Sequence, residues 1–433
     1  MKPGLDIKRL VLWSMYNFGH AIALIVFFLY YSEWLVVDRG VPDIWFNMTF
    51  VGASLLFLLT VPVAGSVADK LNVNMPGLRV TTIFSFIFFF LTGFIAEIYP
   101  AYYVLSAVTF SLASYFYLFC YTYYNPLLKD VAVHEKHGLA SGWGMFGDYS
   151  GQIFGLLVSL PVVSGALVLF GPDGRAATLM PAAILFLIFS LPMLIFFKEK
   201  STKVCVKIDI VKEYRDVVGS FIKMCALPGV GLFLLAYFFF NDAVTTASNN
   251  FPIWMDKVMS ITGNTQSLVL ISIIFTGVIG APISGWLADR FGFKKVLLWN
   301  LAGWMVILPI FAAIHGFIAF IIACLVMGVW YGSIWTITRA YLLHLTPRSF
   351  LNRSFTYYTL MERFATFIGP LSWGLAVTYL PKADAMNYRF AAILMAIFII
   401  IGYIIARKLP RKAAINPLDL DMLGHKVKPP AGY

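Results

Sequence analysis

Long apolar segments recur along the whole chain and are separated by short polar connections. Each segment has about 20 residues or more, the length that an α-helix needs to cross the hydrocarbon core of a bilayer. Lipid offers the backbone no hydrogen-bond partners, so a helix is the structure expected of such a segment. The pattern predicts an all-α polytopic membrane protein with helices at residues 12–37, 44–68, 78–97, 100–124, 139–165, 176–197, 228–255, 265–288, 294–314, 316–345, 354–380 and 388–406.

The composition supports this interpretation. Of the 433 residues 60% are hydrophobic and 12% are charged, and the mean hydropathy is +0.82. Soluble domains have about 45–50% apolar and about 25% charged residues, so their cores cannot absorb this much apolar surface. Almost no chain is left for a soluble domain, and we expect membrane lipids as partners. The net charge of +11 is explained by loops, without nucleic acid.

Positive charge is unevenly distributed between the two sides of the predicted membrane. With a cytoplasmic N-terminus, most of the 32 Lys and Arg residues lie in cytoplasmic loops and tails. Such enrichment marks the cytoplasmic side, so we expect both termini there. The first helix has no small-residue cleavage site and is expected to be retained. Short tails and loops favour a bacterial inner membrane, and we expect a monomer. Five basic residues fall on the opposite side: Arg39, Arg175, Lys257, Lys382 and Arg389.

One long basic connection divides the predicted helices into two sets of six. Within it Ile210, Phe221 and Ile222 fall at helical spacing, opposite Lys212 and Arg215. This pattern indicates an amphipathic helix on the inner membrane surface. A helix that merely tethers the two halves is the alternative. The predicted domains are an N-terminal half at 1–197, a linker at 198–227, a C-terminal half at 228–409 and a cytoplasmic tail at 410–433.

A short motif occurs at the same place in each half. A glycine four residues before an aspartate lets a neighbouring helix come close, and the carboxylate can accept hydrogen bonds from the open N-terminus of that neighbour. Such a carboxylate could hold the two halves closed on one side of the membrane, and a purely structural turn is the alternative. The motif residues are Gly65, Asp69 and Lys70 in the first copy and Gly285, Asp289 and Arg290 in the second.

The second copy, from Gly285 to Lys295, fits the pattern G-x-x-x-D-[RK]-x-G-x-[RK]-[RK], and it resembles the signature loop of the major facilitator superfamily. The first copy departs from this pattern after Lys70. The resemblance implies the twelve-helix facilitator fold, in which two six-helix halves alternate in exposing a central site.

A narrower resemblance covers most of the chain. Several segments in order are similar to the autophagy-related vacuolar effluxer-like family, whose fungal members are associated with amino-acid efflux. This resemblance implies a small-molecule substrate of the amino-acid class. The matching segments are Tyr124 to Val131, Glu135, Gly138, Ser141-Gly142, Asn241-Asp242, Thr338-Arg339, Tyr358, Arg363 and Gly369-Pro370.

Ionisable residues inside membrane helices are costly unless they are paired or face water, so each is a functional candidate. Asp242 and Asn241 fall near the middle of one predicted helix, and Asp148 and Gln152 near the middle of another. Desolvation favours the protonated form of a carboxyl group, so Asp148 or Asp242 could carry a coupled proton. The alternative is an ion pair with a helix arginine.

Arg339 and Arg363 lie in predicted helices nearer the cytoplasm. A guanidinium is always charged and binds carboxylates in a forked geometry, so either residue could bind an anionic group of the substrate. Together with the central aspartates they suit a zwitterion. Glu362 and Arg363 could instead form a structural ion pair.

Four further residues are candidates for lining the site. Asn17 and His20 share a face of the first predicted helix, and His20 could contact substrate or relay a proton. Tyr121 and Trp335 could form walls of the site. Packing is the alternative for all four. Close packing also explains a stripe of small residues at Gly144, Gly147, Gly151 and Gly155.

The chain lacks the phosphate-binding loop of ATPases, the ligand spacing of metal sites and a serine nucleophile elbow, so we expect no cofactor, no metal and no enzyme activity. The leading hypothesis is a proton-coupled secondary transporter of a small polar solute such as an amino acid. One alternative is proton-linked export of a drug, siderophore or other metabolite. A membrane receptor or scaffold without transport is an alternative of another class.

Overall fold

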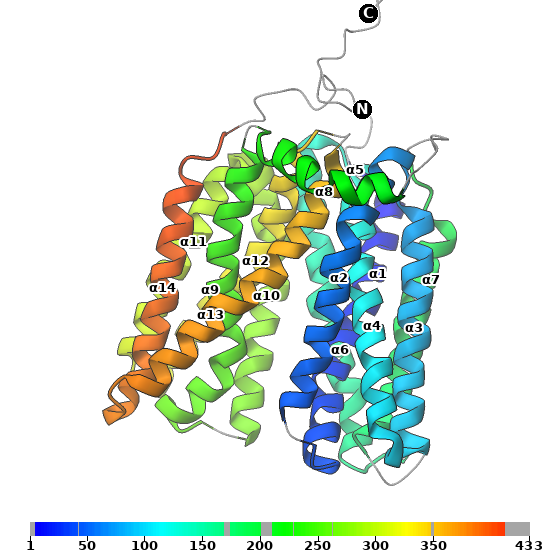
Figure 1. Cartoon of the computed structure of the whole chain (residues 1–433). Helices are drawn as coiled ribbons and strands as arrows, with labels where there is room; N and C mark the ends of the chain where they lie inside the picture. The colour runs from blue at the N-terminus through cyan, green and yellow to red at the C-terminus, as the bar shows by residue number, and fades with distance from the viewer. Residues whose placement is uncertain are drawn as a thin grey trace, which may run out of the picture. The chain divides into compact units, whose positions relative to one another are not determined.

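The computed structural model describes residues 5–41, 43–168, 174–200, 210–227, 229–261, 263–347 and 350–411. These residues are almost entirely helical (Figure 1). No β-strand occurs among them, and one isolated bridge pairs Leu5 with Ala132. The predicted all-α class is therefore confirmed.

Ten helices in the described part of the chain are long and apolar enough to cross a membrane: α1, α2, α3, α4, α7, α9, α10, α11, α12 and α14. Helices α6 and α13 have 27 and 29 residues, so they are also long enough to cross a membrane. They carry more polar groups, among them Asp148 in α6 and Glu362 in α13. The ten and these two make the predicted twelve helices, each close to its predicted range.

The chain forms two compact units, each described by itself. The first contains residues 1–132 and 144–214. Its core gathers aromatic side chains such as Phe89, Phe110 and Phe186 between α3, α4 and α7. Its helices are α1 (Ile7–Val26), α2 (Asp43–Leu71), α3 (Met75–Ile98), α4 (Tyr103–Tyr124), the short α5 (Leu128–Val131) and α7 (Leu179–Phe196).

The second unit contains residues 133–143 and 215–433. Helix α6 (His137–Val163) contributes to both units, and α8 (Ile210–Cys225) begins in the first unit and continues in the second. Buried Trp254, Phe311 and Phe320 pack together here. The remaining helices are α9 (Val230–Met259), α10 (Gly263–Phe291), α11 (Phe293–Ala313), α12 (Phe317–Leu345), α13 (Leu351–Tyr379) and α14 (Met386–Ala406).

The same helix pairings occur in both units. In the first unit α1 packs on α7, α2 on α4, and α3 on both α4 and α7. In the second unit α9 packs on α14, α10 on α12, and α11 on both α12 and α14. The order of pairing is identical when the helices are matched from the first to the last. The repeat predicted from the motif is thus a repeat of architecture, whereas the predicted domain bounds stay a prediction.

The glycine stripe of α6 lies against α1 in the first unit. A Cβ atom on Gly147 would meet the backbone of Ser14, and one on Gly151 would lie 2.9 Å from the carbonyl carbon of Phe18. Real Cβ atoms do not come this close to a backbone. Glycine at these positions therefore lets two helix backbones touch, as small residues do in membrane helix pairs.

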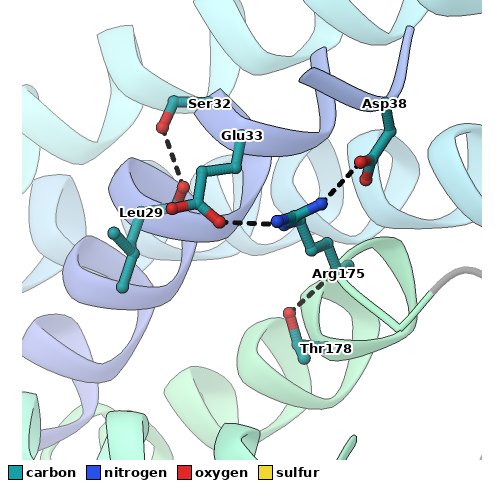
Figure 2. A network of polar contacts seen from close by, with 6 residues as sticks. All are labelled: Leu29, Ser32, Glu33, Asp38, Arg175 and Thr178. Atoms are coloured by element: carbon teal, nitrogen blue, oxygen red, sulfur yellow. Dashed lines mark hydrogen bonds and ion pairs between the residues drawn. The ribbon is translucent and has the colours of Figure 1, made fainter. Parts of the chain in front are cut away.

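The end of α1 is tied to the start of α7 by an ionic network (Figure 2). Beyond Val26 the helix continues as two π-helical turns, Phe27–Tyr31 and Trp34–Asp38. The Arg175 guanidinium donates to Glu33 Oε2 at 2.8 Å and to Asp38 Oδ1 at 2.5 Å. Partial burial by itself would lower the pKa of Arg175, but the hydrogen bonds and charges of Glu33 and Asp38 raise the pKa overall. The fork holds these wide turns in place.

Replacing Gly151 by Ala should destabilise the protein, because the added methyl group meets the Phe18 backbone. Overpacking of this kind costs about 1–3 kcal/mol. We expect a lower thermal unfolding temperature in detergent. Gly374→Ala is the matched control, because no atom lies within 4 Å of a Cβ at that position. Equal unfolding temperatures for the two variants would contradict the packing argument.

Candidate functional site

The second motif copy holds the beginning of α6. Asp289, near the end of α10, accepts a hydrogen bond from Gly138 N–H at Oδ1 (2.8 Å) and one from Leu139 N–H at Oδ2 (2.7 Å). These amides belong to the first turn of α6, where N–H groups have no partner within the helix. The carboxylate satisfies two of them and also lies at the positive end of the helix dipole.

Glycines make this contact possible. A Cβ on Gly138 would lie 2.8 Å from Asp289 Oδ1, and one on Gly142 would lie 2.6 Å from the carbonyl oxygen of Ala281. A Cβ on Gly285 would also collide with the backbone of α6, 3.1 Å from the Cα of Leu139. The glycine four residues before Asp289 therefore provides close approach, and the aspartate provides the cap. The gating role of Gly285 and Asp289 stays a prediction.

Arg339 holds the next turn of α6. Its Nε donates to Ser141 Oγ at 3.1 Å, and one terminal nitrogen donates to the Ser141 carbonyl oxygen at 3.0 Å. Ser141 Oγ in turn donates to the Thr336 carbonyl oxygen at 2.8 Å. The guanidinium is thus engaged with α6, and its predicted contact with a substrate anion stays a prediction. The sequence analysis gave no structural role to Ser141.

The basic residue after Asp289 has a different environment. Arg290 is exposed, and its guanidinium lies 5.4 Å from the ring centres of both Trp286 and Phe291. Cation–π contacts of this length stabilise an exposed turn modestly. Arg290 therefore braces the end of α10.

The first motif copy also has a residue with positive φ at the position of Gly292. Gly292 has φ +92° where the pattern requires glycine, and Asn72 takes the same place with φ +53°. Asparagine is among the few residues that tolerate this region. The missing basic residues are replaced by a cap, because the Glu199 carboxylate accepts from the backbone N–H groups of Asn74 and Met75 at 2.8–3.1 Å. Gly65 and Asp69 are buried in this copy.

Five candidate residues lie in the first unit. Asp148 is 7% exposed and accepts a hydrogen bond from Gln152 Nε2 at 2.9 Å, one helical turn away on α6. Asn17 donates from Nδ2 to the Gly144 carbonyl oxygen at 2.8 Å and so braces α1 against α6. In both contacts a side-chain amide donates to an oxygen atom of α6, and buried polar groups are costly to stability without such hydrogen bonds.

His20 is fully buried in an aromatic cluster. Its ring stacks on Tyr117 with 3.6 Å between centres and meets the edge of Tyr121 at 4.5 Å. Neither ring nitrogen has a hydrogen-bond partner among the described residues. The charge of Asp148 also acts on Tyr117. The structure therefore brings the candidates His20, Tyr121 and Asp148 into one neighbourhood through Tyr117.

Asp242 lies at the contact between α9 and α13 in the second unit. It is 1% exposed, and Asn241 beside it is 2% exposed. Thr246 Oγ1 is 3.5 Å from Asp242 Oδ1, and a Cβ on Gly369 would lie 2.5 Å from the same oxygen. Glycine at 369 therefore gives the carboxylate its space against α13.

Glu362 lies at the same contact, two turns before Gly369. Tyr237 on α9 donates from its hydroxyl group to Glu362 Oε1 at 2.5 Å. The Tyr237 ring stacks on Tyr358 with centres 4.2 Å apart, and the Tyr358 hydroxyl is 2.9 Å from Thr338 Oγ1. The sequence analysis missed Tyr237, although it stands four residues before Asn241 on the same helix face.

The two remaining candidates lie on α12 and α13. Trp335 meets Tyr331 edge to face at 4.9 Å on α12. Arg363 is partly buried, and its charge acts on Glu362. Among the described residues no group of three or more His, Cys, Asp and Glu side chains could hold a metal ion.

Comparison with known proteins agrees with this architecture. Residues 233–430 match the family described as Major Facilitator Superfamily. The fucose:proton symporter FucP of E. coli has the same fold, with a TM-score of 0.71 and 16% identity over 94% of this chain and 99% of FucP. The chain has the fold of the major facilitator superfamily.

Two proteins are similar to this chain in sequence. The uncharacterized MFS-type transporter YxiO of Bacillus subtilis (strain 168) is 26% identical over 329 residues, which cover 73% of this chain and 72% of YxiO. MdtD of Salmonella typhimurium (strain LT2), provisionally described as a multidrug resistance protein, is 26% identical over 155 residues, 34% of this chain and 32% of MdtD. The narrower resemblance to the autophagy-related family stays a prediction.

Replacing Asp289 by Asn should loosen the first turn of α6. Hydrogen bonds to a charged group contribute about 1.5–3 kcal/mol, so we expect the amides of Gly138 and Leu139 to exchange with deuterium about tenfold faster or more. Mass spectrometry of the peptide covering 134–143 measures this. Asp384→Asn is the control, because Asp384 lies exposed in another loop. Unchanged exchange in Asp289→Asn would contradict the cap.

Proposed function

We propose that this protein is a proton-coupled secondary transporter that moves a small zwitterionic solute, such as an amino acid, by alternating access. The observation that carries the proposal is the burial of Asp148 and Asp242 near the middle of helices α6 and α9, at 7% and 1% exposure. Carboxyl groups at such depth are costly to a membrane protein, and those that membrane helices retain typically mark substrate or ion pathways. A receptor or scaffold would have no use for them.

The described helices carry groups suited to both charges of a zwitterion. In the first unit Asp148 lies near the aromatic rings of Tyr117 and His20, and a carboxylate with aromatic faces suits a cationic amine. In the second unit Arg363 is partly buried on α13 and suits a carboxylate. Five further candidates add polar and aromatic side chains on α1, α6, α4, α9 and α12, in that order: Asn17, Gln152, Tyr121, Asn241 and Trp335.

The similarity in fold to FucP, a fucose:proton symporter, supports coupling to protons. Cytoplasmic enrichment of Lys and Arg supports an orientation with both termini in the cytoplasm. With short loops it also supports a bacterial inner membrane. The autophagy-related resemblance supports amino acids as the substrate class, and we propose that the protein works as a monomer.

Cytoplasmic gating is part of this proposal. Asp289 and Arg339 hold the first two turns of α6 through Gly138, Leu139 and Ser141. Any movement of α6 away from α10 and α12 must break these bonds. The contact therefore suits a latch that releases once in each transport cycle, and Asp69 is its counterpart in the first motif copy.

The test is uptake by purified protein in lipid vesicles with an imposed pH gradient and a panel of labelled L-amino acids. A preceding thermal-shift screen of the same panel narrows the choice, because a bound substrate stabilises the fold. Wild-type protein should accumulate at least one member. Asp242→Asn and Asp148→Asn should lower gradient-driven uptake to background, since each substitution removes one of the buried carboxylates on which the proposal rests.

Asp256→Asn is the matched control. Asp256 lies on the same helix as Asp242, but its side chain is 40% exposed and pairs with Lys257 at 3.0 Å. Its uptake should equal that of the wild type. Unchanged uptake in both Asp242→Asn and Asp148→Asn would refute their part in coupling, and no uptake of any amino acid would refute the substrate class.

The similarity to MdtD favours proton-linked drug export as a second candidate function. The similarity covers about a third of each chain, so it supports transport in general more directly than it supports a drug as the substrate. Export of a fluorescent cationic drug from the same vesicles, with no amino-acid uptake, would favour this candidate.

A further inference from the structure

The candidate carboxylates receive hydrogen bonds from different kinds of groups. Asp289 is held by two backbone N–H groups, and Asp148 by the side-chain amide of Gln152. Thr246 reaches Asp242 only at 3.5 Å. Glu362 is bonded by the Tyr237 hydroxyl at 2.5 Å, the shortest of these contacts.

This difference decides which carboxyl group can alternate between two protonation states. A backbone N–H can only donate, so this contact favours the ionised form of its carboxylate partner. A phenol hydroxyl can donate or accept, so it serves the carboxylate and the neutral acid equally. Gln152 could accept from a neutral Asp148 only through its amide oxygen, which requires a flip of the side chain. Of the four residues, Glu362 has the partner that fits both states without such a flip, at a strong hydrogen-bond distance.

The reversible contacts extend beyond Tyr237. Its ring stacks on Tyr358, and either hydroxyl of the Tyr358–Thr338 pair can be the donor at 2.9 Å. These groups come from α9, α13 and α12. Two of them, Tyr237 and Thr338, are fully buried, and Tyr358 is 3% exposed. Three helices therefore contribute rotatable hydroxyl groups to one set of contacts, in which the Tyr237 hydroxyl bonds Glu362 directly.

Charged neighbours balance the ionised form. Arg363 on α13 and Arg339 on α12 both act on Glu362, and neither guanidinium can lose its proton. The facing titratable groups are Tyr237 on α9 and Tyr358 on α13. Glu362 itself is only partly buried, so the acid is not sealed from exchange. The surroundings thus support the carboxylate by charge and the neutral acid by hydroxyl groups.

We propose that Glu362 takes up and releases the coupled proton, and that Tyr237 is its positioning residue. The proposal rests on the proton-coupled function above and assigns the coupling step to one carboxyl group. In that step a proton adds to a carboxylate oxygen of Glu362 and later leaves from it, and no other bond forms or breaks. Asp148 and Asp242 then contact the solute.

Infrared difference spectroscopy of the protein in lipid tests this without any substrate. Spectra at acidic and alkaline pH should differ by the carbonyl band of a protonated buried carboxyl group. This band should be lost in Glu362→Gln. In Tyr237→Phe it should shift, because the hydroxyl partner is removed while the ring stack on Tyr358 is kept.

Two controls match these substitutions. Asp384→Asn removes an exposed carboxyl group, and Tyr403→Phe removes a hydroxyl group on α14; both should leave the band unchanged. A band that persists in Glu362→Gln, or that is absent from the wild type, would overturn the proposal. If Glu362→Gln fails to fold, an unshifted band in Tyr237→Phe overturns it equally.

A transport measurement separates this proposal from the proposed function. If wild-type vesicles take up an amino acid, Glu362→Gln should lose uptake driven by a pH gradient and keep exchange of labelled for unlabelled amino acid at equal pH. Loss of both would overturn the coupling role, because it would make Glu362 part of substrate binding. If no amino acid moves, the infrared result still decides whether Glu362 carries a proton.

Discussion

Backbone polar groups inside the hydrocarbon layer must find their partners within the protein, and the structure depends on this constraint. Backbone groups meet it by forming helices, and the open helix ends meet it through side chains. Asp289 caps the first turn of α6, and Glu199 caps the first turn of α3. Both carboxylates lie where a helix begins at the end of a connection, which is where unpaired N–H groups remain.

The same constraint applies to buried polar side chains, which form hydrogen bonds within the protein. Arg339 donates hydrogen bonds to Ser141, and Asp148 accepts one from its neighbour Gln152. Glu362 has a hydroxyl partner that can reverse its role. Structural and functional polar groups can therefore be distinguished by the chemistry of their partners, because fixed donors hold one protonation state and reversible ones permit two.

Glycine distribution explains how the helices bring these groups together. On α6, glycines face α1 in the first unit and α10 in the second, so one helix packs closely along its length in both units. Gly369 on α13 does the same for Asp242. A stripe that reads only as close packing thus also determines where carboxylates fit, because a single Cβ at Gly138 or Gly369 would occupy the space of an oxygen atom.

The sequence by itself determined the helices, their repeat and the aspartate cap, because hydropathy, spacing and the Gly-to-Asp motif are local properties of the chain. Asp148, Asp242 and Glu362 could be singled out for the same reason, since a charge within an apolar segment is visible in one dimension. Only the tertiary structure decided their partners. Tyr237, Ser141 and Glu199 are 125, 198 and 125 residues from the groups that they contact, so no local pattern could pair them.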